Sequence, residues 1–361
     1  MKKQTEYTAA VVGGAGDWGR HYLRAYHINR DCRLIAVVDK ARERRKVFAD
    51  RYQIPEQFDT VHDLLQSMVP DIVSIILPVS QTYKAVMRCA EAGVGVISCE
   101  KPISENLAKA DEMVLRCRDR GIPFSCGTAL WEVAHLREIG QWAQAGNIGR
   151  FTEAAIPMGV TQQVSGIGCV VFNLLRFLTG CEAQWVEGWT IPEEAADGDD
   201  DCGAYGRIGF SGGFVCTVPS PGEIAPEAAQ VSLSGSEGRI WLGRPHPVLV
   251  KGKGALAGPV YPEFFTDFAG KVFPAFFDEV VKDLVVCRSV GKEASCGGHD
   301  YRQALEIAIA FKLSARSGHG RVQLPLEERD INLYPIPYRW LGGDVTGWEV
   351  IGVKGPPAPV D

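Results

Sequence analysis

The first third of the chain alternates short apolar runs with amphipathic segments. The apolar runs predict strands at 9–13, 33–39, 71–77, 95–99 and 122–126. The segments between them predict helices at 17–29, 41–52, 60–68, 81–92 and 106–120. Strands that alternate with helices form parallel sheets covered on both faces, and continuous apolar runs are typical of central strands in such sheets. We therefore expect a doubly wound α/β domain over residues 1–126.

The pattern changes after residue 126. A helix is predicted at 133–145, and a series of strands with alternating polarity and glycine turns follows it. These strands are expected at 149–158, 183–191, 203–210, 213–219, 229–234 and 238–243. Alternating polarity is typical of antiparallel sheets with one solvated face. The glycine-containing turns at 211–213 and 235–238 suit hairpin connections. We therefore expect a second α/β domain over 127–330, with a large, open, mostly antiparallel sheet.

The last part of the chain contains two more predicted helices and an irregular tail. Helices at 272–287 and 299–317 are expected to pack on or beside the second sheet. Residues 331–361 are rich in proline, glycine and aromatic residues. We expect this tail to wrap over a surface or over a neighbouring subunit. The acidic stretch at 193–201 is expected to be a solvated loop.

Composition limits the classes of function. The 361 residues suit two domains, and 46% apolar with 23% charged residues is ordinary for a globular protein. No apolar run is long enough for a membrane span and the N-terminus lacks the apolar core of a signal peptide, so a cytoplasmic protein is expected. The net charge of −6 disfavours nucleic acid as partner. The eleven cysteines include no C-x-x-C pair, so free thiols and no metal are expected.

A glycine-rich turn follows the first predicted strand. It reads Gly13-Gly14-Ala15-Gly16-Asp17-Trp18-Gly19 and leads into a predicted helix. Gly14 is expected to permit the tight turn, Gly16 to let the backbone approach a pyrophosphate, and Gly19 to let the helix pack closely on the strand. The N-terminus of that helix would then face phosphate groups with its N–H donors. This arrangement predicts a dinucleotide site.

An acidic residue stands where such a site needs one. Asp39 ends the second apolar run, 20 residues after Gly19, where a carboxylate accepts hydrogen bonds from the adenosine ribose hydroxyls. A carboxylate there repels the 2′-phosphate of NADP, so NAD is the favoured cofactor. Four basic residues follow at once and leave NADP as the alternative: Lys40, Arg42, Arg44 and Arg45.

The loops after the third and fourth predicted strands are the next candidates, because ligands bind beyond the carboxyl ends of parallel strands. Leu77 and Pro78 end the third strand, and Glu100-Lys101-Pro102 follow the fourth. A lysine at this edge could hydrogen-bond a substrate hydroxyl and pass a proton as hydride leaves. The alternative is a surface lysine before a turn that Pro102 starts.

These motifs resemble those of the Gfo/Idh/MocA oxidoreductases. The resemblance includes the glycine turn with Asp39, Glu100-Lys101-Pro102, the turn at 235–238 and the late helix around 304–318. It implies a Rossmann domain followed by an α/β domain whose open sheet carries the substrate pocket and a homo-oligomer interface. It also implies hydride exchange between NAD(P) and a sugar, cyclitol or related hydroxyl compound. The residues expected at the cofactor are Gly14, Gly16, Asp17, Trp18, Gly19, Asp39, Lys40, Leu77, Pro78, Thr82, Glu100 and Lys101.

The chain departs from the family pattern at the residue that takes the substrate proton. Family members carry an Asp-x-x-x-His-x-x-Asp/Asn stretch in the second domain. Aligning the helix at 172–180 with it puts Gly166 at the aspartate, Val170 at the histidine and Asn173 at the last position. Thr82 stands where the family often has another histidine. The usual base is therefore missing.

Three explanations stay open for this departure. In the first, Lys101 alone serves as acid and base while other side chains position the substrate; the candidates are Tyr83, His135, Gln162, Gln163 and Asn173. His135 has a plainer alternative as a capping or packing residue. In the second, bound NAD transiently oxidises a glycoside so that its aglycone is eliminated. In the third, the protein is a dinucleotide-binding sensor that has lost catalysis, against which the presence of Lys101 weighs.

Overall fold

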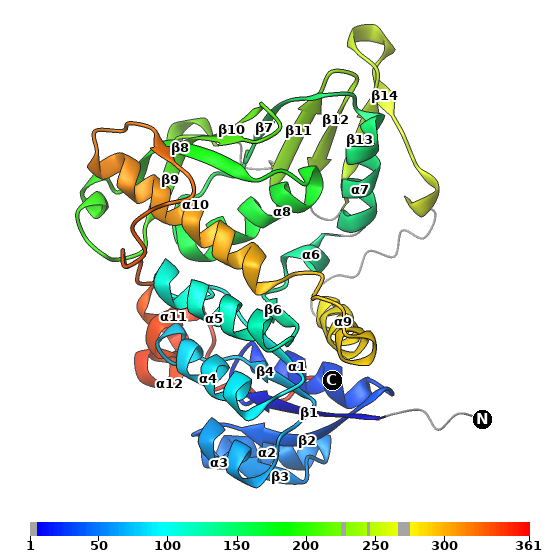
Figure 1. The fold of residues 1–361 in the computed structure, drawn as a ribbon, viewed down its shortest axis with the longest axis vertical. Coiled ribbons are helices and arrows are strands. Elements are labelled where there is room, and N and C mark those ends of the chain that lie inside the picture. Colours follow the sequence, from blue (N-terminus) through cyan, green and yellow to red (C-terminus); the bar gives the residue numbers. More distant parts are fainter. Residues whose placement is uncertain (1–5, 134, 225–228, 244–245, 266–274) are drawn as a thin grey trace. The chain divides into compact units, whose positions relative to one another are not determined.

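The computed structural model describes residues 6–133, 135–224, 229–243, 246–265 and 275–361. It divides the chain into two compact units, each with its own sheet (Figure 1). The first unit comprises Met1–Thr128, Phe273–Arg302 and Pro335–Asp361, and the second comprises Ala129–Val272 and Gln303–Tyr334. The sequence pattern placed the two later segments of the first unit in the second domain and in a separate tail.

The first unit contains a six-stranded sheet in the order β3-β2-β1-β4-β5-β6. All neighbouring strands are parallel, as predicted. The strands are β1 (Tyr7–Val12), β2 (Cys32–Val38), β3 (Glu56–Phe58), β4 (Ile72–Ile75), β5 (Val96–Cys99) and β6 (Phe124–Cys126). The helices between them are α1 (Gly19–Ile28), α2 (Arg42–Tyr52), α3 (Val61–Ser67), α4 (Val79–Ala92) and α5 (Leu107–Asp119). Both faces of the central strands are buried, since every residue of β4 is buried.

Helix α9 (Phe276–Val290) packs on this first sheet and on α1. Arg288 forms an ion pair with Asp71 at the start of β4, with 2.8 Å between Nη2 and Oδ1. Arg24 of α1 pairs with Asp278 at the same N–O distance, 2.8 Å. The helix expected at 272–287 therefore exists, but its placement beside the second sheet was wrong; residues 272–274 lie outside the described residues. An amphipathic pattern reports that a face is buried and does not report which sheet buries it.

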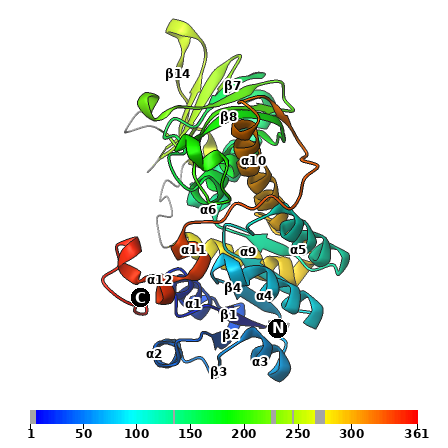
Figure 2. The same cartoon turned by 90° about the vertical axis from the view of Figure 1, so that its left-hand side faces the viewer.

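The C-terminal tail covers part of the first unit. It forms α11 (Pro337–Leu341), α12 (Gly343–Thr346) and a 3-10 turn at Trp348–Ile351, and α11 contacts α4. Figures 1 and 2 draw these short helices in red beside the first sheet and its helices. Ser80 of α4 donates a hydrogen bond to the carbonyl of Trp340 at 2.6 Å. Near the chain end, the Tyr52 hydroxyl donates to the Val360 carbonyl at 2.6 Å. The tail is thus fixed along its length to the first unit.

The second unit contains a nine-stranded sheet in the order β14-β13-β12-β11-β7-β10-β9-β8-β15. Its pairs are antiparallel except that β10 runs parallel to β7, so the prediction of a mostly antiparallel sheet is confirmed. The strands are β7 (Phe151–Ala155), β8 (Ala183–Ile191), β9 (Gly203–Phe210), β10 (Val215–Val218), β11 (Val231–Gly235), β12 (Gly238–Leu242), β13 (Val248–Lys251), β14 (Gly258–Pro259) and β15 (Val322–Gln323). Glycine turns connect β9 to β10 and β11 to β12, as expected.

Helices of the second unit lie before and after strands of its sheet. Those described are α6 (Ala129–Glu132), α7 (Leu136–Trp142), a π-helical turn at Val164–Gly168, α8 (Cys169–Thr179) and α10 (Gly298–Arg316), whose residues from Gln303 on belong to this unit. Residue 134 of the helix predicted at 133–145 lies outside the described residues. Five of the six acidic residues in the acidic stretch are exposed, as predicted; the stretch also contains a 3-10 turn at Glu193–Ala196, and Asp201 is partly buried.

Two properties concern the described residues as a whole. All eleven cysteines are free thiols, and each except Cys181 is buried. Among the described residues, no helix combines the length and the apolar character that crossing a bilayer requires.

Candidate cofactor-binding site

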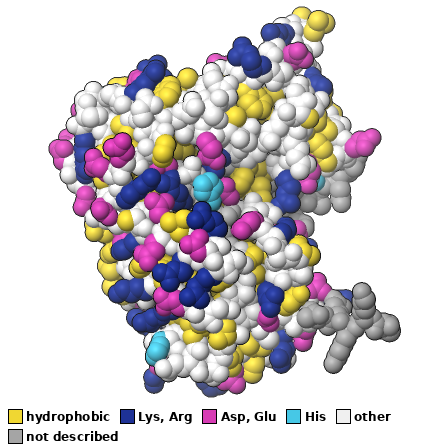
Figure 3. Space-filling view, in the orientation of Figure 1, with side chains coloured by type: hydrophobic (Ala, Val, Ile, Leu, Met, Phe, Trp, Pro, Cys, Tyr) yellow, Lys and Arg dark blue, Asp and Glu magenta, His cyan; other side chains and the backbone are white. Residues whose placement is uncertain are grey.

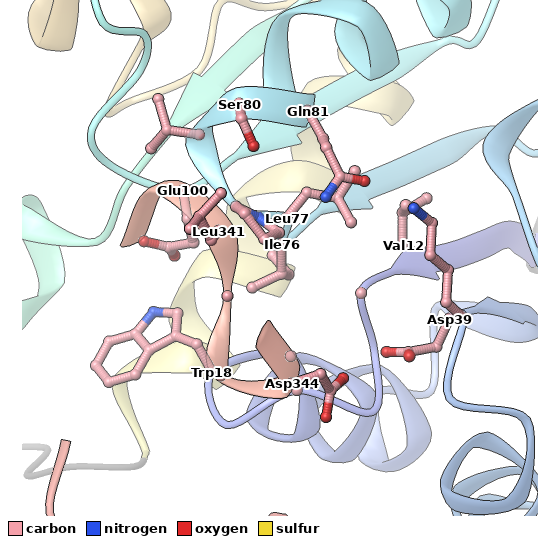
Figure 4. A pocket seen from close by; sticks show the side chains of 18 of the residues that line it. Val12, Trp18, Asp39, Ile76, Leu77, Ser80, Gln81, Glu100, Leu341 and Asp344 are labelled. Carbon is pink, nitrogen blue, oxygen red and sulfur yellow. The ribbon is translucent and has the colours of Figure 1, made fainter. Parts of the chain in front are cut away.

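A pocket of about 730 Å³ lies in the first unit, beyond the carboxyl ends of β1, β2, β4 and β5. Its volume falls within the range of ~300–1,000 Å³ that is usual for small-molecule sites. Trp18 and Asp39 lie on opposite sides of the pocket, with Ile76 and Leu77 between them (Figure 4). Of the residues expected at the cofactor, the pocket is lined by Gly16, Asp17, Trp18, Gly19, Asp39, Lys40, Leu77, Pro78, Glu100 and Lys101.

The glycine turn forms the wall of the pocket where β1 leads into α1. Gly13 has a left-handed φ of +76°, and a Cβ there would lie 2.0 Å from the carbonyl oxygen of Ile76. A Cβ on Gly19 would lie 2.1 Å from the Gly13 carbonyl oxygen, so the start of α1 packs directly on the turn. Gly14, expected to permit the tight turn, instead packs against Val37, where a Cβ would lie 2.8 Å from Cγ2. The left-handed residue is therefore one position earlier than expected.

Asp39 lies at the other end of the pocket, directly after β2. Its carboxylate accepts hydrogen bonds from the backbone N–H of Ala15 at 3.1 Å and of Ala41 at 3.0 Å. Only 10% of the side chain is exposed. Burial raises the pKa of Asp39, while these two N–H groups and the nearby Arg44 guanidinium oppose that shift. The side chain is thus fixed beside the glycine turn and lines the pocket.

Glu100 and Lys101 follow β5 and line the pocket on the side of Trp18. The Tyr22 hydroxyl donates to Glu100 Oε1 at 2.7 Å, and burial raises the pKa of Tyr22 well above its usual value. Tyr22 therefore remains a donor that orients the Glu100 side chain. Lys101 Nζ lies 5.9 Å from the centroid of the Trp18 ring, within the range of a cation–π contact. A flexible ammonium group is thus held at one end of the pocket.

Two of the residues expected at the cofactor do not line the pocket. Gly14 is packed behind the turn, as described above. Thr82 is buried in the first turn of α4, where its hydroxyl donates to the Pro78 carbonyl at 3.3 Å. Thr82 therefore stabilises the loop after β4 rather than forming the pocket surface.

The residues expected to position the substrate are not gathered at this pocket. Tyr83 donates a hydrogen bond to Glu112 of α5. Gln162 is exposed, and Gln163 has a left-handed φ of +52° before the π-helical turn. His135, with φ +57°, stacks on Phe265 with 5.9 Å between ring centroids, which fits the packing alternative for this residue. Asn173 belongs to α8 and is described next.

Helix α8 begins in an apolar environment. Cys169 and Val170 in its first turn are buried. Asn173 is fully buried, and its Oδ1 accepts a hydrogen bond from Arg176 Nη1 at 2.8 Å. In the π-helical turn before α8, the Ser165 hydroxyl donates to Asp201 at 2.7 Å, and burial raises the pKa of Asp201 to about 6. Sequence reasoning missed Asp201 because the acidic residues around it suggested a solvated loop.

The tail contributes a part of the pocket that sequence reasoning also missed. Its lining residues include Tyr338, Arg339, Leu341, Gly342, Gly343, Asp344, Val345, Trp348 and Ile351. A tail rich in proline and glycine carries no signal that would assign it to a site more than 200 residues earlier in the chain.

Comparison with known proteins agrees with this geometry. Residues 8–128 match the sequence model of the family described as "Oxidoreductase family, NAD-binding Rossmann fold", GFO_IDH_MocA. Over these residues the chain is similar to the Gfo/Idh/MocA oxidoreductases and has their NAD-binding Rossmann fold. Together with the relatives described below, this match confirms the expected fold, an oxidoreductase class and NAD as the type of cofactor. The pocket residues fit NAD, because glycines without Cβ atoms form one wall and the Asp39 carboxylate stands where such sites hold the adenosine ribose.

Individual relatives span most of the chain at low identity. D-apiose dehydrogenase of Paraburkholderia graminis is 23% identical over 86% of this chain and 88% of its own length. Myo-inositol 2-dehydrogenase of Thermotoga maritima is 22% identical over 84% of this chain and 95% of its own length. The aldose-aldose oxidoreductase of Caulobacter crescentus, solved with glycerol, superposes with a TM-score of 0.72 at 21% identity and covers 88% of this chain and 100% of its own. That likeness shows the shared fold.

Proposed function

We propose that this Gfo/Idh/MocA oxidoreductase transfers hydride between NAD and a hydroxyl or keto group of a sugar, cyclitol or glycoside, with Lys101 as the centre of its proton relay. The observation that carries the proposal is the position of Lys101. It lines the pocket beyond β5 with its Nζ 5.9 Å from the ring of Trp18, which lies on the opposite side of the pocket from Asp39 (Figure 4). An adenosine ribose at Asp39 and a pyrophosphate at the glycine turn leave that opposite end for the nicotinamide.

Each wall of the pocket has a separate role in this proposal. Asp39 accepts hydrogen bonds from the ribose hydroxyls, and the N-terminus of α1 at Gly19 faces the pyrophosphate. Leu77 and Pro78 supply an apolar surface between the two ends. Bound NAD supplies a ring that accepts a hydride from the carbinol carbon of the substrate. The protein would orient the nicotinamide ring and the substrate relative to each other and would transfer the hydroxyl proton.

The proton is the part assigned to Lys101. As the carbinol C–H pair leaves as hydride, the hydroxyl proton must also leave, so that an alcohol becomes a ketone or aldehyde. In the oxidation direction, the neutral Lys101 amine would accept that hydroxyl proton. The ammonium so formed would hydrogen-bond the developing carbonyl oxygen and then release the proton to solvent water. The Trp18 ring beside Nζ restricts the positions that this side chain adopts, and the Lys101 backbone N–H donates to Glu100 Oε2 at 3.3 Å.

The substrate class rests on the named relatives, which include dehydrogenases of D-apiose and of myo-inositol. On the face shown in Figure 3, acidic and basic side chains are interspersed, which fits a small polar ligand better than nucleic acid. We further propose that two copies associate through the second sheet. Its strand β8 alternates buried with partly exposed residues, and Arg321 stacks on Trp185 there at 3.9 Å from the ring centroid.

The experiment follows absorbance of reduced nicotinamide while the protein with NAD meets sugars, cyclitols, glycosides and their keto forms, with product analysis. Steady reduction by one class is the expected result and identifies the substrate. Release of an aglycone without net reduction would support redox-assisted elimination instead. If NAD binds tightly but no compound is oxidised, reduced or cleaved, the enzyme proposal is overturned in favour of a sensor.

A further inference from the structure

Arg44 occupies an unusual position between the glycine turn and the C-terminal tail. It belongs to the first turn of α2, and 14% of its side chain is exposed. Its Nε donates to the carbonyl oxygen of Ala15 at 2.7 Å, and its Nη2 lies 4.0 Å from Asp39 Oδ1. The guanidinium is therefore fixed beside the carboxylate that marks the ribose end of the pocket.

The tail holds the other side of this guanidinium. Nη1 and Nη2 of Arg44 donate to the two carboxylate oxygens of Asp344, at 2.9 and 2.6 Å. The Arg44 guanidinium carbon also lies 5.3 Å from the Trp348 ring centroid. Trp348 in turn donates from Nε1 to Asp344 at 3.2 Å, so the tryptophan orients the carboxylate as well as covering the guanidinium.

The contact is specific rather than a chance surface pair. It is bidentate, which matches the planar fork of arginine to a carboxylate. Gly343 permits it, because a Cβ at that position would lie 2.6 Å from the Trp348 ring. The Arg44 contact lowers the pKa of Asp344, so its carboxylate stays ionised at neutral pH.

An arginine next to the acidic position of a Rossmann site is the group that accommodates the 2′-phosphate of NADP. Here Asp344 occupies the two terminal nitrogens that such a phosphate would use. Asp344 also lines the pocket, so it adds a second carboxylate to that of Asp39 at the end of the pocket near Arg44 (Figure 4). A 2′-phosphate would have to displace one carboxylate and approach another. The free 2′-hydroxyl of NAD meets neither obstacle.

We propose that the C-terminal tail determines the cofactor choice of this enzyme: Asp344, oriented by Trp348, holds Arg44 away from a 2′-phosphate and so favours NAD over NADP. The inference rests on the proposed placement of the cofactor, with its ribose at Asp39. It assigns a role in cofactor specificity to a segment about 300 residues after Asp39, the residue proposed to bind the adenosine ribose.

The test measures the dissociation constants of NAD⁺ and NADP⁺ by isothermal titration calorimetry with the wild type and Asp344→Asn. Half of the Asp344 side chain is exposed, so the substitution is tolerated by the fold. We expect the preference for NAD⁺ over NADP⁺ to fall about tenfold, mainly through tighter NADP⁺ binding, as for one charged hydrogen-bonded pair at a partly exposed site. Asp344→Glu, which keeps the charge, should retain most of the wild-type preference.

Two further variants make the outcome specific. Glu349→Gln removes the same charge from an exposed residue of the tail that does not line the pocket, and it should leave the ratio unchanged. Arg44→Ala combined with Asp344→Asn should lose the gained NADP⁺ affinity. An NAD⁺-selective wild type with an unaltered ratio in Asp344→Asn overturns this inference and leaves the proposed function intact. A wild type that binds neither dinucleotide overturns both.

Discussion

The cofactor pocket and the start of α8 differ in nearly every property that chemistry requires. The pocket is open to ligands and contains ionisable groups at both ends, Asp39 with Arg44 at one and Glu100 with Lys101 at the other. The start of α8 is buried, with Val170 where the family resemblance would put a histidine. The proposed dinucleotide binding and proton transfer are therefore assigned to the first unit, and Val170 in α8 is part of the buried core.

The same difference appears when Asp39 of the pocket is compared with Asn173 of α8. Asp39 is held by two backbone N–H groups and still lines the pocket. Asn173 is fully buried and its oxygen is taken by Arg176, which itself pairs with Glu182. A polar residue whose partners lie inside the fold stabilises that fold. One that also faces a cavity is available for a ligand.

The largest expected effect comes from removing the amine of the pocket. Lys101→Met should lower turnover about 10²–10⁴-fold, the usual contribution of a proton-transfer group, while the dissociation constant of NAD changes only a few-fold. Steady-state kinetics and calorimetry measure the two quantities. Asp201→Asn, which removes the titratable partner of Ser165 in the second unit, should keep turnover within a few-fold. A large loss of turnover in Asp201→Asn with little loss in Lys101→Met would instead assign the proton relay to the second unit.

The ribose end of the pocket gives the next effect. Asp39→Ala should weaken NAD binding about 10- to 100-fold, because hydrogen bonds from the ribose to a charged acceptor are lost, and should narrow the preference over NADP. Calorimetric titrations with both dinucleotides measure this. An unaltered ratio of the two affinities would mean that the Asp39 carboxylate does not contact the ribose.

In α8 the expected effect is on stability. Asn173→Ala should lower the free energy of unfolding by about 2 to 3 kcal/mol, because the buried Arg176 nitrogen loses its acceptor. Denaturant titration measures the loss. NAD affinity should stay at the wild-type value; a large loss of NAD affinity in a folded variant would contradict the separation of the two regions.

The smallest effect is a pH dependence in the first unit. His21 of α1 stacks on Phe277 with 5.1 Å between centroids, and burial lowers its pKa to about 4. Between the unfolded value of 6.5 and 4, the unfolded state binds more protons, so stability falls as pH falls. We expect a loss of about 2 kcal/mol from pH 7 to 5 that is absent in His21→Gln. Equal losses in both proteins would contradict this cause.

The sequence predicted what depends on local pattern. Spacing alone located the turn at Gly16 and Gly19 and the acid at Asp39, because a strand, a turn and a helix fix their relative positions within 40 residues. The two sheets followed from the change in periodicity near residue 126. The very short strands β14 and β15, at two residues each, were missed because no periodicity exists over that length.

The sequence did not predict which distant segments pack against each other. The contact of Arg44 with Asp344 and Trp348 joins residues about 300 positions apart, and the sequence distinguished Arg44 in no way from the other basic residues after Asp39. The placement of α9 failed for the same reason, since its partner Asp71 is distant in sequence. Burial patterns identify that a surface is covered, whereas the identity of the covering segment depends on the whole fold.

Hydride transfer at this pocket can be tested directly with an isotope. The protein is mixed with NAD⁺ and a polyol or sugar substrate deuterated at the carbinol carbon, and the reduced cofactor is analysed by mass spectrometry. We predict deuterium in the reduced nicotinamide of the wild type, and the same label at a much lower rate in Lys101→Met. A wild type that binds NAD⁺ tightly but leaves it unreduced and unlabelled with every substrate class would contradict the account.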